Sequence, residues 1–423
     1  MIRLAIVITH PIQYYVPIFR LLSQNCELKV FYTWGLGGIK AKHDPGFGKT
    51  IAWDLPMLEG YNYELLENIA VSPGSHHGKG IVNPDIISKI ERFSPNAILV
   101  YGYIYQSHFK VMSHFKGKIP IWFRGDSTLL DKQSGLKEIA KKLYLKWVYN
   151  QVDKAFYVGT NNKSYFKRYG LKDKQLIFAP HAIDNQRFAE DRRLEATQLR
   201  ETLDIREHDI LILFAGKLEP KKNPALLLEA FMRLCTKKNE TDFSTTVEMT
   251  AEKEMARKGG IHLLFVGNGI LEEQLKKKAE RYFDRLSMTN TNVLNDEVVN
   301  PIQFMDFQNQ TQMPVVYQAC DIFCLPRQGP GETWGLAINE AMAAGKAIVA
   351  SDKVGCAVDL VKTGLNGYIF KSGSVADLER KLSLLISRPK SIRSFGEQSK
   401  SIIQQWSFEA QISQFITQLN ATK

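Results

Sequence analysis

Two glutamates, Glu332 and Glu340, lie eight positions apart across the predicted junction of a loop and a helix. Eight helical residues rise about 12 Å, a span that suits a ligand with polar groups at both ends and an anion between them. The glycines of residues 329–335 leave backbone N–H groups free at the helix N-terminus, where the partial positive charge favours phosphate. A nucleotide diphosphate sugar has this layout, because two phosphates separate the hydroxyl groups of its ribose from those of its sugar.

Two lysines indicate a second anion site farther upstream. Residues 209–215 (DILILFA) predict a buried strand, and the glycine turn after it contains Lys217 and Lys222 before a helix begins. Asn223 is placed to cap that helix, and Pro224 suits its first position. Surface lysines rarely bracket a glycine turn after a buried strand, so these two cations before a helix N-terminus predict an anion site.

The elements that must position these groups are strands of a parallel sheet. Continuous apolar runs alternate with helical patterns along the chain, and such runs are typical of strands that are buried on both faces. The predicted strands are 2–8, 28–32, 97–101, 119–123, 154–158, 209–215, 262–267, 321–326 and 347–350. Ligands of open α/β sheets bind beyond the carboxyl ends of the strands. At 423 residues the chain is long enough for two such domains.

Polar side chains of the N-terminal half also follow strand ends. His10 and Gln13 follow the first strand, Tyr103 the third, and Arg124 and Asp126 the fourth. Asp126 could accept hydrogen bonds from sugar hydroxyls or assist the acceptor, and Arg124 could hold a phosphate or an acidic sugar. Alternatively, His10 caps the following helix or packs under it, and Arg124 and Asp126 form an ion pair that only shapes their loop.

A long loop, residues 34–60, follows the second strand and contains Trp34, Phe47 and Trp53. A loop of this length inside a compact domain is usually functional or mobile. Its aromatic side chains could stack on sugar rings, or they could simply hold the loop down.

The stretch 136–148 predicts a basic amphipathic helix, since apolar residues recur at helical spacing and lysines occupy the other faces. Such a helix with a tryptophan can lie on an anionic membrane, and the alternative is a domain helix with a solvated lysine face. The formal charge of +11 and the pI near 9.2 predict attraction to an anion. The sequence has no basic and aromatic signature of a nucleic-acid module, so we expect lipid or phosphate and no nucleic acid.

Several of these motifs resemble one enzyme family. Glu332, Trp334-Gly335-Leu336, Glu340-Ala341-Met342-Ala343 and Gly345 resemble the E-x7-E signature of retaining glycosyltransferases of family 4. The resemblance is firm over 205–390 apart from a polar insertion, and it implies the GT-B fold: an α/β chain with two Rossmann-like, doubly wound domains that face each other across a cleft. The implied domains are an acceptor-side domain, 1–187, to which the helix within 405–423 crosses back, and a nucleotide-sugar domain, 188–404.

The resemblance also implies roles for individual residues. Lys217 and Lys222 stand where the family has an arginine and a lysine that clamp the diphosphate, and Asp126 stands where many members have a histidine that contacts the donor sugar. Glu340 would bind the ribose hydroxyls. The implied catalytic residues are Glu332, Lys222, Lys217 and Asp126. The other implied donor-binding residues are Glu340, Gly216, Thr333, Trp334, Gly335, Leu336, Asp306 and Gly267, and the acceptor or cleft candidates are His10, Gln13, Arg124 and Tyr103.

The implied reaction moves a glycosyl group, with retention, from a nucleotide sugar to a hydroxyl of a glycan or lipid-linked acceptor. By fold analogy the context is bacterial surface polysaccharide synthesis. No two aspartates lie two positions apart, so a DxD metal site is absent from the sequence, and we expect neither a metal nor a cofactor. The GNG at 267–269 lacks the third glycine of a dinucleotide fingerprint, so we do not expect NAD binding. Two alternatives stay open: a GT-B protein that binds a nucleotide sugar or saccharide without turnover, and a nucleotide-sugar epimerase.

The remaining features concern the compartment of the protein. No run of about 18 uncharged apolar residues occurs, so we expect no spanning helix. The five scattered cysteines indicate packed thiols in a reducing compartment. We therefore expect a cytoplasmic protein, with contact to the inner face of the cell membrane as an option. Residues 236–260 are polar and predict a surface insertion, which could be disordered.

Overall fold

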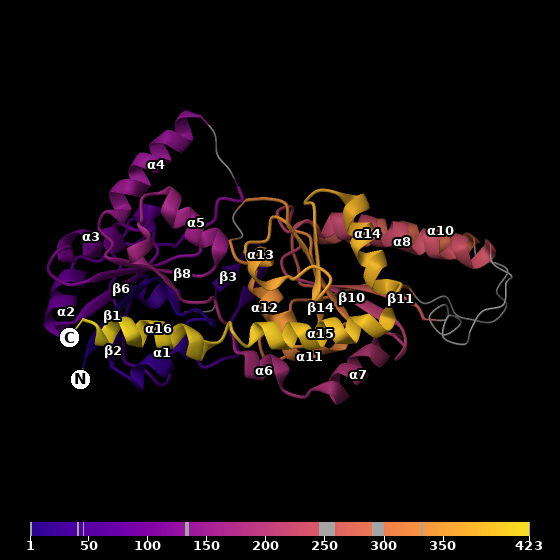
Figure 1. The fold of residues 1–423 in the computed structure, drawn as a ribbon, viewed down its shortest axis with the longest axis horizontal. Helices are drawn as coiled ribbons and strands as arrows, with labels where there is room; N and C mark the ends of the chain where they lie inside the picture. The colour runs from indigo at the N-terminus through magenta and orange to yellow at the C-terminus, as the bar shows by residue number, and fades with distance from the viewer. Residues whose placement is uncertain are drawn as a thin grey trace. The chain divides into compact units, whose positions relative to one another are not determined.

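The computed structural model describes residues 2–39, 42–44, 46–131, 135–244, 259–289, 300–330 and 333–422 (Figure 1). The chain divides into two compact units. Unit 1 comprises Met1–Lys42, Ile51–Asp184 and Gln405–Lys423, and unit 2 comprises His43–Thr50 and Asn185–Gln404. The division lies three residues before the boundary predicted at 187. Residues 43–50 were predicted to belong to the first domain, 1–187, but the structure groups them with unit 2.

Unit 1 is built on a seven-stranded sheet in which every described pairing is parallel. Its strand order is β5 (Tyr63–Leu65), β2 (Glu27–Tyr32), β1 (Arg3–Ile8), β6 (Ala97–Tyr101), β7 (Ile121–Arg124), β8 (Lys154–Tyr157) and β9 (Leu176–Phe178). This is the order of a Rossmann sheet with a seventh strand added at one edge. The central strands β1 and β6 are almost fully buried, as expected for continuous apolar runs covered on both faces.

Helices cover both faces of the unit 1 sheet. They are α1 (Val16–Ser23), α2 (Ile86–Phe93), α3 (Gln106–Phe115), α4 (Leu136–Tyr149), α5 (Thr160–Arg168) and α16 (Phe408–Asn420). Although α16 ends the chain, it lies beside α1 (Figure 1). Its Phe415 ring lies 4.4 Å from the ring of Phe156 in β8. The Ser407 side chain accepts a hydrogen bond from the Ala410 N–H and so caps this helix.

Unit 2 contains a six-stranded parallel sheet with the Rossmann order. The order is β12 (Ile302–Met305), β11 (Ile261–Val266), β10 (Ile210–Ala215), β13 (Ile322–Leu325), β14 (Ala347–Ser351) and β15 (Gly367–Phe370). After β12 the chain returns to the other side of β10 and adds β13 there. The loops that leave β10 and β13 therefore run to opposite faces of the sheet and diverge. That point is where such sheets bind ligands.

The helices of unit 2 are α6 (Asn185–Ala189), α7 (Arg193–Thr202), α8 (Pro224–Ser244), α10 (Glu272–Thr289), α11 (Met313–Ala319), α12 (Leu336–Ala343), α13 (Ala357–Leu360), α14 (Val375–Ile386) and α15 (Pro389–Ile403). The helices α8 and α10 lie side by side (Figure 1). The first nine residues of the predicted insertion at 236–260 continue α8, and residues 245–258 lie outside the described ranges. The short strands β3 (Lys42–Asp44) and β4 (Lys49–Ile51) form a separate two-stranded sheet.

All five cysteines are free and buried, which agrees with the packed thiols expected from the sequence. None of the helices within the described ranges is long and apolar enough to cross a membrane. A search of the same ranges finds no group of three or more His, Cys, Asp or Glu side chains that could hold a metal ion.

Candidate functional site

Two loops meet at the point in unit 2 where the strand order reverses. Loop 216–223 follows β10, and loop 326–335 follows β13. The Gln328 N–H donates to the Lys221 carbonyl oxygen over 3.0 Å. The Asn223 side-chain amide donates to Gln328 Oε1 over 2.9 Å. These bonds hold the lysine-containing loop against the loop that leads into α12, so the two anion sites predicted from the sequence become neighbours.

The side chain of Lys222 lies against Gly216. This glycine has a φ of 147°, a conformation that favours glycine, and a Cβ there would lie 3.3 Å from Lys222 Cδ. Its carbonyl oxygen would lie only 2.2 Å from a Cβ at Gly267. Both glycines are therefore needed for the close approach of the turns after β10 and β11. Three of the predicted donor-site residues, Lys222, Gly216 and Gly267, thus lie together, and Lys217 is next in the chain.

The helix after the lysine loop begins at Pro224, as predicted. Asn223 before it has a φ of 55°, in the left-handed region that asparagine tolerates better than most residues. Its side chain also makes the inter-loop bond to Gln328, which the sequence pattern did not indicate.

The carboxylate of Glu340 is held inside unit 2. Glu340 lies in α12 and is 4% exposed. Its Oε2 accepts a hydrogen bond of 2.8 Å from the hydroxyl of Tyr317, a residue of α11 that is 1% exposed. Sequence reasoning missed Tyr317, although its hydroxyl is a polar group in a mostly apolar helical stretch. A carboxyl oxygen with a fixed donor has a defined orientation, which is useful for binding hydroxyl groups.

Hydrogen bonds of Trp334 hold the turn before α12 in place. Gly335 has a φ of 96° and immediately precedes the helix. The Trp334 indole N–H donates to Asn339 Oδ1 over 2.9 Å, and the Trp334 carbonyl accepts from the Cys356 N–H over 2.9 Å. Thr333 and Leu336 flank this turn and are partly exposed. The predicted donor-sugar carboxylate, Glu332, lies outside the described residues.

Asp306 follows β12 beside the turn that contains Gly267. Its Oδ1 accepts a hydrogen bond of 2.8 Å from the side chain of Asn268, which is 5% exposed. Its Oδ2 accepts a bond of 2.8 Å from Lys49 Nζ. The hydrogen bonds from Lys49 and Asn268 lower the pKa of Asp306, so the carboxylate is ionised at neutral pH.

A segment of the long loop predicted at 34–60 contacts the same region. Lys217 Nζ donates to Oδ1 and Oδ2 of Asp44 over 2.7 and 2.9 Å. Burial raises the pKa of Asp44, but the hydrogen bonds from Lys217, Gly46 and Phe47 outweigh it and leave the pKa below its usual value. The loop was predicted to be functional or mobile, but its local sequence did not indicate that it would meet Lys217.

Arg124 differs from its predicted role in unit 1. The side chain is 1% exposed, and its two terminal nitrogens donate to the carbonyl oxygens of Ala179 and Pro180 over 2.9 and 3.1 Å. It therefore ties the end of β7 to the chain after β9. A guanidinium buried in this way is not presented to a phosphate or an acidic sugar, so we leave Arg124 out of the proposed site.

Asp126 lies two residues farther along and is partly exposed. Burial, with the charge of Asp126 as the next cause, raises the pKa of Tyr15. The ring of Tyr15 also stacks on His181 with centroids 5.7 Å apart. Burial and the charge of Arg124 lower the pKa of His181, so this imidazole is neutral.

The other cleft candidates of unit 1 follow β1 and β6, between which the strand order of this sheet reverses. The Nδ1 atom of His10 is hydrogen-bonded to the Thr9 hydroxyl over 2.8 Å, and the ring meets the edge of Trp34 at 5.5 Å. Gln13 is partly exposed. Tyr103 packs among aromatic rings, with centroid distances of 6.1 Å to Phe123, 6.3 Å to Tyr144 and 5.9 Å to Tyr149.

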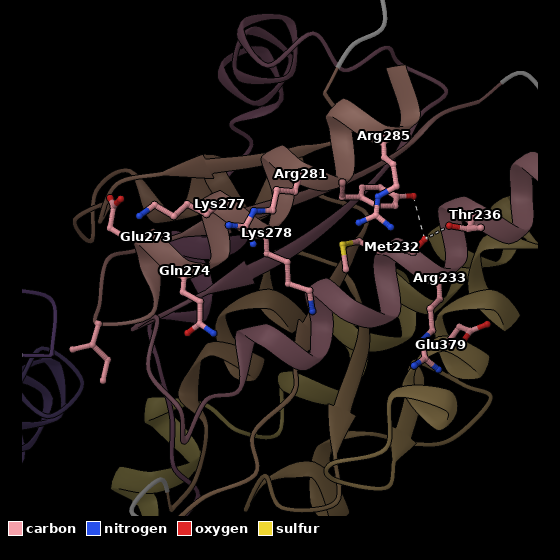
Figure 2. A pocket seen from close by; sticks show the side chains of 12 residues that line it. Met232, Arg233, Thr236, Glu273, Gln274, Lys277, Lys278, Arg281, Arg285 and Glu379 are labelled. Atoms are coloured by element: carbon pink, nitrogen blue, oxygen red, sulfur yellow. Dashed lines mark hydrogen bonds between the residues drawn. The ribbon is translucent and has the colours of Figure 1, made fainter. Parts of the chain in front are cut away.

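A separate groove of about 1090 Å³ lies along α8 and α10 (Figure 2). It is lined by residues of both charges, and Lys278 and Arg233 both pair with Glu229 at 2.6 and 3.4 Å. The Tyr282 and Thr236 hydroxyls donate to the Met232 carbonyl, as the dashed lines in Figure 2 show. None of the residues predicted for the donor site lines this groove.

The C-terminal half of the chain has known relatives. Residues 195–402, nearly half of the chain, match the family model described as Glycosyl transferases group 1. A D-inositol 3-phosphate glycosyltransferase of Segniliparus rotundus is 23% identical over 246 residues, which cover 57% of this chain and 46% of that protein. A lipopolysaccharide 1,2-N-acetylglucosaminetransferase of Salmonella typhimurium is 26% identical over 212 residues, which cover 48% of this chain and 46% of that protein. The chain thus spans somewhat less than half the length of these curated relatives.

Solved structures are similar over the whole chain. Anabaena Alr3699/HepE in complex with UDP has a TM-score of 0.67 at 16% identity, with 100% of both chains covered. WaaG, a glycosyltransferase involved in lipopolysaccharide biosynthesis, has a TM-score of 0.60 at 11% identity and covers 98% of this chain and 99% of its own. At such identities the likeness shows the fold alone. The predicted fold is confirmed: the two parallel-sheet α/β units are those of the GT-B fold.

Proposed function

We propose that this chain is a retaining glycosyltransferase of family 4 that moves a sugar from a nucleotide-diphosphate sugar to a hydroxyl group. One observation carries this proposal: the loop after β10 that contains Lys217 and Lys222 is bonded to the loop that enters α12, where the strand order of a Rossmann sheet reverses. The match of this unit to the group 1 family model supports it. A similar solved structure, that of HepE in complex with UDP-glucose, supports the choice of donor class.

The proposed mechanism rests on charge. As the bond to the sugar breaks, the diphosphate leaving group gains negative charge and the sugar ring becomes positively charged. Lys217, Lys222 and the N-terminus of α12 would stabilise the leaving group without a metal ion, because fixed cations and helix dipoles act on charge that develops in the transition state. Lysine offers a point charge rather than the fork of arginine, so Lys217 would bind a phosphate less rigidly.

The carboxylates would hold the two ends of the donor. Glu340, oriented by Tyr317, would accept hydrogen bonds from the ribose hydroxyls, and Glu332 would bind the donor sugar. Gly267, Asp306 and the turn 333–336 would surround the nucleotide. Asp126, His10, Gln13 and Tyr103 remain candidates for the acceptor side.

We place the acceptor among glycans and lipid-linked glycans, in the synthesis of a bacterial surface polysaccharide. The relatives include a lipopolysaccharide N-acetylglucosaminetransferase and an N-acetylgalactosaminyltransferase whose name specifies a diphospho-undecaprenol substrate. By their names, both transfer an N-acetylated amino sugar, one in lipopolysaccharide and one with a diphospho-undecaprenol compound, and the proposal extends this acceptor class to the present chain.

The helix α4 supports contact with an anionic membrane surface on the cytoplasmic side. Its buried residues are Leu145, Val148 and Tyr149, whereas apolar side chains on the rest of its surface are exposed. The exposed fractions are 84% for Leu136, 58% for Ile139, 67% for Leu143 and 52% for Trp147. Figure 1 shows the start of α4 projecting beyond α3 and α5. Apolar groups flanked by lysines suit a surface of anionic lipids.

The proposed reaction is tested by incubating the protein with a panel of nucleotide sugars, with and without lipid-linked and polysaccharide acceptors. Loss of donor only when an acceptor is present, with retention at the anomeric carbon of the product, supports the transferase. Conversion of the donor without acceptor would identify an epimerase instead. Binding without any turnover would identify a nucleotide-sugar-binding protein.

A further inference from the structure

The carboxylate of Asp44 is bound to Lys217, the lysine that would bind the diphosphate in the proposed mechanism. Lys217 Nζ donates to both of its oxygens, over 2.7 and 2.9 Å. An ammonium group has three hydrogens to donate, so this contact uses two of them. Asp44 and Lys217 are 173 positions apart in the sequence, and both belong to unit 2.

The rest of the segment also lies on residues of the proposed donor site. We call Asp44 and residues 46–49 the cover segment. The Phe47 ring lies 5.0 Å from Lys217 Nζ and 4.9 Å from the ring of Phe307. It would lie 3.6 Å from a Cβ at Gly267. Lys49 Nζ bonds to Asp306 over 2.8 Å. The cover segment therefore contacts three residues of the proposed donor site, Lys217, Gly267 and Asp306.

The local structure of the cover segment fixes the carboxylate in place. Asp44 Oδ1 also accepts hydrogen bonds from the backbone N–H groups of Gly46 and Phe47, over 2.8 and 3.3 Å. The Asp44 carbonyl accepts from the Gly48 N–H over 2.8 Å, and Gly48 has a φ of 66°. A Cβ at Gly46 would lie 2.6 Å from Lys217 Cδ, so this close approach needs glycine. The turn thus presents a fixed anion to Lys217.

A carboxylate and a phosphate are both oxygen anions that bind the same ammonium group. If a diphosphate approached Lys217 while Asp44 stayed in place, two like charges would lie a few Å apart. Phe47 would also remain packed beside Lys217. The two anions are therefore alternatives rather than partners at this lysine.

We propose that Asp44 is an internal competitor for the donor diphosphate, so that the cover segment must leave Lys217 before the donor is fully bound. This inference rests on the proposed function. It also gives the site a means of selection. A ligand that reaches only Lys217, such as inorganic phosphate, makes no other contact in the site that would offset the loss of the Asp44 pair. A nucleotide diphosphate makes contacts elsewhere in the site as well.

The exposure of the Lys217 and Asp44 side chains sets how strongly Asp44 can weaken nucleotide binding. The side chains of Lys217 and Asp44 are 28% and 33% exposed, and ion pairs so close to solvent hold only modestly. The apparent Kd of a ligand rises in proportion as the binding-competent fraction falls. Removing the charge of Asp44 should therefore tighten nucleotide diphosphate binding about two- to fivefold.

The test is calorimetric titration of UDP, GDP and ADP into the full chain and into Asp44→Asn. The asparagine keeps a side-chain oxygen for the Gly46 N–H, so the turn is preserved. Asp191→Asn is the matched control, because Asp191 is another ion-paired aspartate of unit 2, with Arg193 at 2.7 Å. We expect the nucleotide that binds the wild type to bind Asp44→Asn two- to fivefold more tightly and Asp191→Asn equally well.

Amide exchange provides a second measurement. Saturation with the same nucleotide should speed hydrogen exchange of the peptide that contains residues 43–50, because the turn loses the contacts to Lys217, Phe307 and Asp306 that hold it in place. Equal or weaker binding to Asp44→Asn, or slower exchange of that peptide, would overturn the inference while leaving the nucleotide site intact. If neither protein binds any of the three nucleotides, the proposed function fails and the inference with it.

Discussion

The hydroxyl of Tyr317 donates a hydrogen bond of 2.8 Å to the carboxylate of Glu340, and both residues are buried in unit 2. A bond to a charged group is worth about 1.5–3 kcal/mol. The tyrosine thus sets the orientation of the acid that we assign to the ribose.

Tyr317→Phe keeps the ring but removes this donor. We expect the Kd for the nucleotide to rise about five- to tenfold, because part of the hydrogen-bond energy that orients Glu340 is lost. Titration calorimetry measures the Kd, and Tyr368→Phe, whose ring packs on Phe395 in the same unit, is the control. A lower melting temperature with an unchanged Kd would mean that Tyr317 only supports the fold.

Lys222→Met removes a cation from the proposed leaving-group site. If Lys222 stabilises charge that develops in the transition state, kcat should fall by about 10²–10³-fold. The matched control is Lys221→Met, since this neighbouring lysine pairs with Glu219 at 3.2 Å. Steady-state kinetics with the donor found in the panel gives both values, and a similar kcat for the two variants would remove Lys222 from the mechanism.

Asp126 either takes part in the reaction or only shapes the loop after β7, and one substitution distinguishes these two roles. Asp126→Asn keeps the shape of the side chain and removes its charge. If the carboxylate takes part in proton transfer or binds the reacting sugar, we expect kcat to fall by about 10²-fold or more. An active variant in the same kinetic assay would show that the residue only shapes the loop after β7.

The exposed apolar face of α4 predicts binding to anionic vesicles. The pair Ile139→Ser and Leu143→Ser should weaken co-sedimentation, because the apolar area that enters the lipid interface is lost. Replacing Lys141, Lys142 and Lys146 with glutamine should weaken it further and remove its salt dependence, at about 1 kcal/mol per lysine.

The control for the α4 variants is the pair Leu365→Ser and Leu384→Ser, which replaces two exposed leucines of unit 2. Vesicles of purely zwitterionic lipid serve as the second control. Unchanged sedimentation of the α4 variants with anionic vesicles would make this helix a solvated element of unit 1.

His108 predicts a pH dependence of stability. Burial lowers its pKa to about 4, against only partial compensation from the carbonyls of Gly102 and Tyr101. The neutral ring bonds to the Thr33 hydroxyl over 2.8 Å and to the Tyr101 carbonyl over 3.0 Å. The unfolded chain, with an ordinary pKa near 6.5, takes up a proton that the folded chain does not.

The free energy of unfolding should therefore be constant, as far as His108 is concerned, above about pH 6.5 and fall between pH 6.5 and 4, by about 3 kcal/mol in total. Urea unfolding at a series of pH values measures this slope. His108→Gln should flatten it, and His208→Gln, at an exposed position, should leave it unchanged. An equally steep slope for His108→Gln would contradict the assignment.

Local patterns in the sequence determined the strands and the lysine motif. The run DILILFA predicted a buried strand, and β10 occupies it because six consecutive apolar residues suit a strand covered on both faces. Lys217 and Lys222 both belong to the loop that follows β10, and Gly216 at its start allows the side chain of Lys222 to come near. The apolar stripe at 136–148 predicted α4, but periodicity could not decide which side of that helix would face solvent.

Contacts between distant segments were decided only by the tertiary structure. The pairing of Asp44 with Lys217, the bond from Tyr317 to Glu340 and the burial of Arg124 against the Ala179 carbonyl each join residues from different elements. A periodic pattern specifies the local conformation and the buried face of an element. It does not specify which remote side chain will meet that face, because this depends on how the whole chain packs.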